Sequence, residues 1–163
     1  MITSGMMSSN TPEWSTPQYI VNWSSNRFQM GHPYVLDAAA TFENKKAPCF
    51  FSEEHSALEL KWNASRIWLN PPYGRIISKF TQRAIQQLQD PQIINSSVTL
   101  LLPARTDTKW FFDLIQNPLQ KHIVFIKGRI AFGSGKSKAP FPSVLIHIES
   151  FDGPITTSYE VVQ

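Results

Sequence analysis

Two kinds of hydrophobic pattern alternate along the chain. Short, nearly continuous apolar runs are typical of buried strands, whereas apolar residues spaced three and four apart are typical of a helix with one buried face. The clearest helix is predicted over residues 76–88, where Ile77, Phe80, Ala84 and Leu88 fall on one face. Strands are predicted at residues 33–37, 48–51, 66–69, 97–102, 122–126 and 143–148. Further helices are predicted from residue 16 onward, at residues 56–62 and at residues 107–115.

The order of these elements predicts the fold class. Strands that alternate with helices indicate an α/β fold around a mainly parallel sheet. No helix separates the last two predicted strands, so the strand at residues 143–148 is expected to add antiparallel. Residues 1–12 are small and polar, which predicts a disordered lead-in to a single domain over residues 13–163.

The start of the first helix follows from its residue types. Thr16 is predicted to be the N-cap, and Pro17 suits the first helical position because its missing N–H is not needed there. Tyr19, Ile20 and Trp23 are then expected on the packed face.

The composition is that of an ordinary globular protein, with 42% hydrophobic and 17% charged residues. The longest apolar run, residues 98–103, is too short to cross a bilayer, and the first residues lack the features of a signal peptide. We therefore expect an intracellular protein without a membrane partner. The one cysteine, Cys49, excludes an internal disulfide or a cysteine-rich metal site and is expected to be buried. A net charge of +3 is compatible with a polyanionic partner without requiring one.

A rigid corner of Asn70, Pro71, Pro72 and Tyr73 ends the strand predicted at residues 66–69. In open α/β sheets, ligands bind beyond the carboxyl ends of the strands. The prolines fix φ and carry no N–H, so the carbonyls of the corner can accept hydrogen bonds. A planar aromatic amine fits here: its NH₂ donates to the Asn70 side-chain oxygen and the Pro71 carbonyl, and its ring stacks on Tyr73. The alternative is a double-proline turn that only ends the strand.

The NPPY corner resembles the catalytic motif of amino-group methyltransferases that use S-adenosylmethionine. The rest of the chain narrows the resemblance to the small phage-type DNA N6-adenine methyltransferases, the Dam-like family. The resemblance runs from residue 13 to residue 148 and rests on the joint order of EWSTP (13–17), LDAAATFENKKAP (36–48), WLNPPYG (68–74), LLPARTDTKWF (101–111), IKGRIAFG (126–133) and APFPS (139–143). It implies a Rossmann-like class I methyltransferase fold and methylation of the N6 amino group of adenine in DNA.

The resemblance also implies roles for particular residues. The four corner residues are expected to carry out catalysis. No metal ion is expected, because the sulfonium of the cofactor already activates the methyl group. Contacts with S-adenosylmethionine fall to Trp14, Thr16, Pro17, Asp37, Ala38 and Glu54, the last together with Glu53 at the ribose. The alternative role of Asp37 is a helix N-cap, and that of the two glutamates is a solvated loop.

Two departures from the family pattern concern the cofactor. Ala38, Ala39 and Ala40 replace the usual glycine-rich turn, so a close approach of the backbone to the cofactor rests on the resemblance alone. Ser56 stands where family members often carry an aspartate that would meet the adenine amino group of the cofactor. Loss of that contact is expected to weaken cofactor binding.

DNA is the expected partner, and its target adenine must be flipped out of the duplex to reach a buried site. Arg105 lies just past a strand end, and Lys127, Arg129, Lys136 and Lys138 lie in or beside a glycine-containing loop. These five residues are predicted to hold the DNA strand through its phosphates. The alternative for the loop residues is a purely solubilising role. No obligate protein partner is expected.

Two other functions stay open at this point. The same motif serves enzymes that methylate the amino group of an RNA base or of a protein glutamine. A catalytically inactive DNA-binding relative would keep the fold, which the altered turn at Ala38 and Ser56 favours and the intact NPPY disfavours. The expected location is the cytoplasm of a bacterial host cell, with the protein encoded by a phage or prophage.

Overall fold

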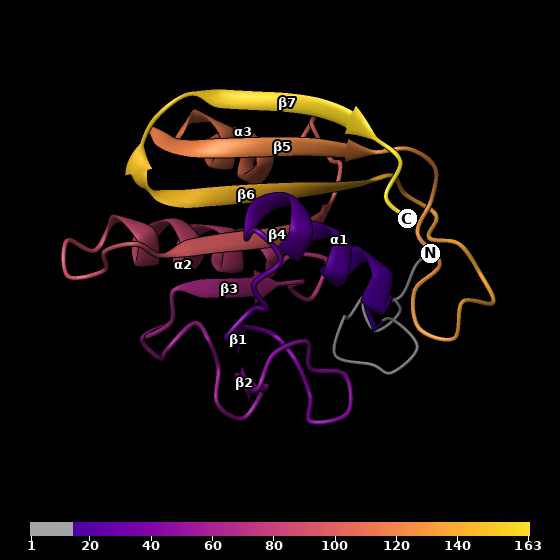
Figure 1. Cartoon of the computed structure of the whole chain (residues 1–163), viewed down its shortest axis with the longest axis horizontal. Coiled ribbons are helices and arrows are strands. Elements are labelled where there is room, and N and C mark those ends of the chain that lie inside the picture. The colour runs from indigo at the N-terminus through magenta and orange to yellow at the C-terminus, as the bar shows by residue number, and fades with distance from the viewer. Residues whose placement is uncertain (1–14) are drawn as a thin grey trace.

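The computed structural model describes residues 15–163, so the predicted lead-in at residues 1–12 and the cofactor role of Trp14 lie outside the described residues. Within residues 15–163 the chain forms one seven-stranded sheet with helices on both faces (Figure 1). The helices are α1 (Gln18–Phe28), α2 (Ile77–Gln89) and α3 (Lys109–Gln116). The strands are β1 (Leu36–Asp37), β2 (Cys49–Phe50), β3 (Arg66–Leu69), β4 (Ser97–Pro103), β5 (Leu119–Ile126), β6 (Ser143–Asp152) and β7 (Ile155–Glu160).

The sheet is mainly parallel, as the alternation of strands and helices predicts. Its strand order is β2-β1-β3-β4-β6-β5-β7. The pairs β1–β2, β1–β3, β3–β4 and β5–β7 are parallel, whereas β6 is antiparallel to both β4 and β5. The predicted antiparallel direction of the strand at residues 143–148 is therefore confirmed. This strand lies inside the sheet, however, and a further strand, β7, follows it.

The parallel strands bring their carboxyl ends to one edge of the sheet, on the right in Figure 1. Asp37 ends β1, Asn70 follows β3 and Pro103 ends β4, so three segments distant in sequence meet there. The loop between β5 and β6 lies at the same end of the molecule. This edge holds the candidate site.

The helix α2 packs as its spacing predicts. Ile77, Phe80, Ala84 and Leu88 are all buried, and together with the apolar side chains of β3 and β4 they form the core on one face of the sheet. Gly74 has φ of 107°, a conformation that favours glycine, and lets the chain turn from the corner into this helix.

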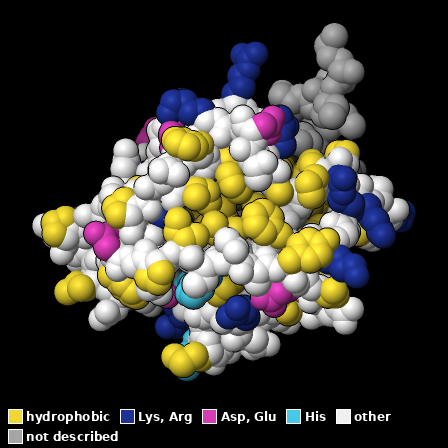
Figure 2. Space-filling model, turned by 90° about the horizontal axis from the view of Figure 1, so that it is seen from above, with side chains coloured by type: hydrophobic (Ala, Val, Ile, Leu, Met, Phe, Trp, Pro, Cys, Tyr) yellow, Lys and Arg dark blue, Asp and Glu magenta, His cyan; other side chains and the backbone are white. Residues whose placement is uncertain are grey.

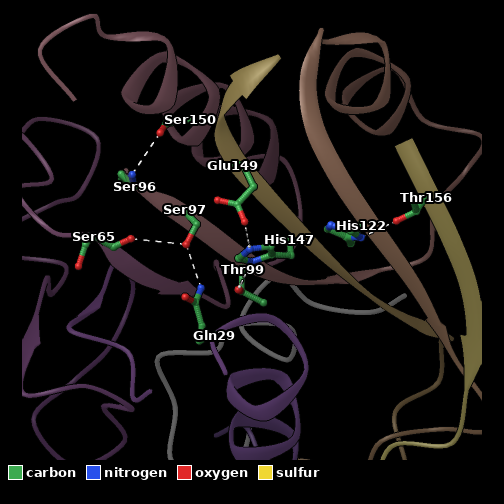
Figure 3. Close-up of polar contacts among 10 residues, drawn as sticks. All are labelled: Gln29, Ser65, Ser96, Ser97, Thr99, His122, His147, Glu149, Ser150 and Thr156. Carbon is green, nitrogen blue, oxygen red and sulfur yellow. Dashed lines mark hydrogen bonds and ion pairs between the residues drawn. The ribbon is translucent and has the colours of Figure 1, made fainter. Parts of the chain in front are cut away.

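The helix α1 covers the opposite face, where polar side chains of β4 and β6 contact one another and the residue that follows α1 (Figure 3). Thr99 Oγ1 on β4 lies 2.8 Å from His147 Nδ1 on β6, and Phe28 at the end of α1 stacks on the His147 ring with centroids 4.7 Å apart. Gln29 Nε2 donates to Ser97 Oγ at 2.9 Å. These contacts fix the carboxyl end of α1, so its amino end reaches the edge that carries the candidate site.

Several local predictions are wrong. Residues 56–62 form a single turn and not a helix. The Ser56 carbonyl accepts from Glu59 N and Leu60 N, but the helical pattern does not continue, because Trp62 N donates to Gln87 Oε1. Cys49 is exposed, because β2 is a two-residue edge strand in which neither residue is buried. Tyr19 is 44% exposed, so it is not on the packed face of α1.

The start of α1 also differs from the prediction by one residue. The helix begins at Gln18 with Pro17 at the N-cap position, and no side-chain capping hydrogen bond occurs within the described residues. Thr16 is therefore not the cap that its residue type suggested. None of the helices in residues 15–163 is long and apolar enough to span a membrane.

Candidate active site

The NPPY corner is buried at the carboxyl edge of the sheet. The strand β3 is hydrogen-bonded between β1 and β4, and the burial continues past its end through Asn70 and Pro71. Asn70 is 4% exposed, and its Nδ2 donates to Thr16 Oγ1 at 2.8 Å. The amide oxygen Oδ1 therefore lies on the opposite side of the Asn70 side chain from Thr16.

Tyr73 is buried rather than open at the surface. Its hydroxyl donates to the Leu101 carbonyl at 3.4 Å, and its ring meets Phe141 edge to face with centroids 5.4 Å apart. Burial raises the pKa of the Tyr73 phenol above its ordinary value. No role was predicted for Phe141 of the APFPS motif, and the structure shows it as an aromatic neighbour of the corner.

Asp37 organises the turn that follows β1. Its Oδ1 accepts from Ala39 N at 3.2 Å, and its Oδ2 accepts from Lys46 N at 2.9 Å. Burial raises the pKa of Asp37 to about 7, against the opposing effect of these two donors. Residues 38–48 are all described and no helix begins among them, so the helix N-cap alternative for Asp37 is wrong.

A cavity of about 320 Å³ opens beside this turn, large enough for a nucleoside-sized group. It is lined by Ala38, Ala39, Phe51, Ser52, Glu53, Ser56, Ala57, Leu58, Pro72, Ile76 and Phe80. The lining brings Ala38 and Ser56 together with the second proline of the corner. Glu53 is part of the lining, whereas the predicted contact Glu54 is exposed and is not.

A second, narrow cavity of about 10 Å³ lies between the segment that precedes α1 and the ends of β1 and β3. It is lined by Ser15, Thr16, Asp37, Ala39, Asn44, Lys46, Trp68 and Asn70. Burial lowers the pKa of Lys46, and the Asp37 carboxyl opposes this shift. Thr16 and Asp37 are thus brought together with Asn70, whereas Pro17 lines neither cavity. Lys46, for which no role was predicted, lines the same cavity.

The four predicted loop residues Lys127, Arg129, Lys136 and Lys138 are exposed. Figure 2 shows dark blue side chains gathered at the right-hand end of the molecule, the end at which Figure 1 places this loop. Apolar side chains of the same loop point inward, and Ile130, Phe132, Ala139 and Phe141 are buried. Because these apolar residues anchor the loop, its exposed basic side chains occupy a defined part of the surface.

Arg105 is exposed just beyond β4, and the loop also contacts this segment through the Ala104 N donor to the Pro142 carbonyl at 2.9 Å. Arg105 Nε lies 3.4 Å from Asp107 Oδ1, and both side chains are largely exposed. The neighbouring carboxylate reduces the positive charge that Arg105 presents. In residues 15–163, no group of three or more histidine, cysteine, aspartate or glutamate side chains is placed to hold a metal ion.

Comparison with known proteins agrees with this geometry. A family model described as DNA N-6-adenine-methyltransferase (Dam) matches residues 3–161. A protein of Escherichia phage T1 named DNA N-6-adenine-methyltransferase is 34% identical over 149 residues, an alignment that covers 78% of this chain and 58% of the phage protein. The similar region therefore spans less than two thirds of the phage protein's length.

Proposed function

This chain belongs to the Dam family of DNA N-6-adenine-methyltransferases, and we propose that it transfers a methyl group from S-adenosylmethionine to the N6 amino group of adenine in DNA. The observation that carries the proposal is the buried Asn70 corner, which lies at the carboxyl edge of the sheet next to a nucleoside-sized cavity. The mainly parallel sheet with antiparallel β6 supports a class I methyltransferase fold.

Asn70 and Pro71 act on the target amine in this proposal. The Asn70 Oδ1 and the Pro71 carbonyl accept hydrogen bonds from the two N6 protons. These bonds draw the nitrogen lone pair out of conjugation with the ring and become stronger as positive charge develops on N6. The bound cofactor supplies a methyl group activated by its sulfonium. An amide oxygen is too weak a base to keep a proton at neutral pH, so the proton lost from N6 passes to water.

We assign the two cavities to the two parts of S-adenosylmethionine. The wider cavity suits the adenosine, with apolar walls for the ring and the Glu53 carboxylate for the ribose hydroxyls. Asp37 and Lys46 offer charges of both signs to the amino and carboxylate groups of the methionine part. The narrow cavity holds no more than about one water, so it has to widen. Lys46 is a half-buried, flexible side chain whose movement would open it.

The DNA side of the proposal rests on the exposed cations at the same edge. Flipping an adenine out of the duplex costs a few kcal/mol, which phosphate contacts with the basic loop offset. We further propose that the protein acts in the cytoplasm of a bacterial host cell, as the phage relative suggests.

The proposal is tested by incubating the purified protein with adenine-containing DNA and methyl-labelled S-adenosylmethionine, then digesting the DNA to nucleosides. We expect label in N6-methyldeoxyadenosine with the wild type and almost none with Asn70→Ala. Parallel reactions with RNA and with protein test the other amino groups. Label in one of those alone would assign a different substrate. Binding of DNA without label in any acceptor would indicate a non-catalytic relative.

A further inference from the structure

We propose that Thr16 is a positioning residue that fixes the orientation of the Asn70 side-chain amide, an inference that rests on the function proposed above. The hydrogen bond from Asn70 Nδ2 to Thr16 Oγ1 is 2.8 Å long and joins residues 54 positions apart. Thr16 is 5% exposed and Asn70 is 4% exposed, so water competes little for this bond.

The hydroxyl of Thr16 is not used to cap α1. A threonine just before a helix usually accepts a hydrogen bond from the first turn. Here no side-chain capping bond occurs within residues 15–163, and α1 begins at Gln18 with Pro17 at the N-cap position. The Thr16 hydroxyl is directed to the catalytic corner and not to the helix.

Orientation matters because the Asn70 side chain has two unlike ends. The oxygen accepts hydrogen bonds and the NH₂ only donates. The target N6 is also an NH₂ group, so it needs the oxygen of Asn70. A rotation of the amide by half a turn would set donor against donor and remove the acceptor. Thr16 holds the NH₂ end of Asn70 and so directs Oδ1 away from itself.

Thr16 is itself held on both sides by backbone hydrogen bonds. The Ser15 carbonyl accepts from Gly133 N at 2.8 Å, and the Pro17 carbonyl accepts from Ile20 N at 3.1 Å. The first bond ties the segment to the basic loop, and the second ties it to α1. The Thr16 hydroxyl is therefore a fixed partner for the amide and not a mobile one.

The test compares Thr16→Val, which keeps the shape and removes the acceptor, with Thr16→Ser, which keeps the hydroxyl. Turnover is measured at saturating DNA and S-adenosylmethionine, the affinity for S-adenosylmethionine by calorimetry, and folding by thermal unfolding. We expect Thr16→Val to lower kcat roughly tenfold, the effect of one hydrogen bond, while Thr16→Ser stays close to the wild type. Cofactor affinity should change by less than about threefold in both variants. Loss of a direct hydrogen bond between Thr16 and the cofactor would instead lower it about tenfold.

The opposite pattern of effects on kcat and cofactor affinity would overturn the inference. If Thr16→Val weakens cofactor binding and keeps the wild-type kcat, Thr16 is a cofactor contact and does not position Asn70. If this variant does not fold, NMR of the wild type decides: an Asn70 side-chain NH₂ without a nuclear Overhauser effect to the Thr16 methyl group contradicts the inference. A wild type that methylates no adenine would instead refute the proposed function itself.

Discussion

At the scale of single residues, the site contrasts two buried polar side chains at neighbouring strand ends. Asn70 carries no charge, so it can be 4% exposed without a change of protonation. Asp37 is 2% exposed, and its burial raises its pKa to about 7. The chemistry at Asn70 is therefore expected to be insensitive to pH near neutrality, whereas the cofactor side of the site is expected to titrate.

Asn70→Ala removes the acceptor that matters most as charge develops on N6. We expect kcat to fall on the order of a hundredfold or more, with DNA and cofactor affinities little changed. Steady-state kinetics beside a direct binding assay on the same DNA measure both quantities. If the variant turned over like the wild type, the corner would be only a structural turn, and the proposed mechanism would fail with it.

We predict that the affinity of the protein for the cofactor depends on pH because Asp37 titrates. Below its pKa of about 7 the carboxyl is neutral and cannot attract the positive charges of S-adenosylmethionine. The affinity is therefore expected to be constant above pH 7 and to fall by up to about tenfold per pH unit below it. Calorimetry from pH 5.5 to 8 measures this dependence, and Asp37→Asn should remove it. An equal slope in the variant would assign the titration to another group.

The same pKa shift has the opposite effect on the stability of the free protein. The folded-state pKa of Asp37 is raised from 3.8 to about 7, so the protonated side chain stabilises the fold at low pH. This contribution is complete below about pH 4 and is lost as the pH rises through about 7. As the pH rises from about 4 to 7, the wild type should therefore lose stability relative to Asp37→Asn, whose side chain does not titrate. Thermal unfolding of both proteins over this pH range measures the difference.

At the scale of elements, apolar spacing was enough to predict α2, β3 and β4, because their burial is continuous or strictly periodic. The strand β7 was missed because its side chains are mostly exposed and polar, so its sequence lacks the apolar pattern of a buried strand. Residues 56–62 were predicted wrongly because Leu58 and Trp62 have helical spacing, whereas side-chain and backbone bonds of Ser56 close a turn. The pairing of Thr16 with Asn70 has no local signal at all, since the fold alone brings them together.

The turn that connects the corner to α2 depends on Gly74. Its φ of 107° is strained for any residue with a Cβ, although an added Cβ would meet no atom within 4 Å. Gly74→Ala should therefore destabilise the protein through the backbone alone, by about 1–3 kcal/mol. Thermal or urea unfolding measures the loss, and Gln86→Ala on the exposed side of α2 is the matched control with no expected loss. Equal stability of Gly74→Ala and the wild type would mean that the turn is not constrained.

At the scale of the whole molecule, the edge of the sheet collects an N-terminal segment, three strand ends and the loop between β5 and β6. The sequence predicted the basic residues of this loop, but not that its apolar residues anchor it. Gly133 N binds the Ser15 carbonyl, and Ala104 N binds the Pro142 carbonyl, so the loop touches both the segment before α1 and the end of β4. Cations on this loop thus lie at the same edge as Asn70.

Binding of DNA through these cations should depend steeply on salt. Each phosphate contact releases counterions, so replacing Lys127, Arg129, Lys136 or Lys138 by alanine should reduce the log–log salt slope by about one unit. Arg105→Ala should have a smaller effect, because Asp107 lies 3.4 Å from the guanidinium. Lys61→Ala is the control: this exposed lysine pairs with Asp90 and precedes β3, at the opposite edge of the sheet. Fluorescence anisotropy of labelled DNA between about 50 and 200 mM salt measures the slopes. If the four loop variants and the Lys61 control all kept the wild-type slope, the loop lysines and arginine would serve only solubility, and the DNA would have to bind elsewhere.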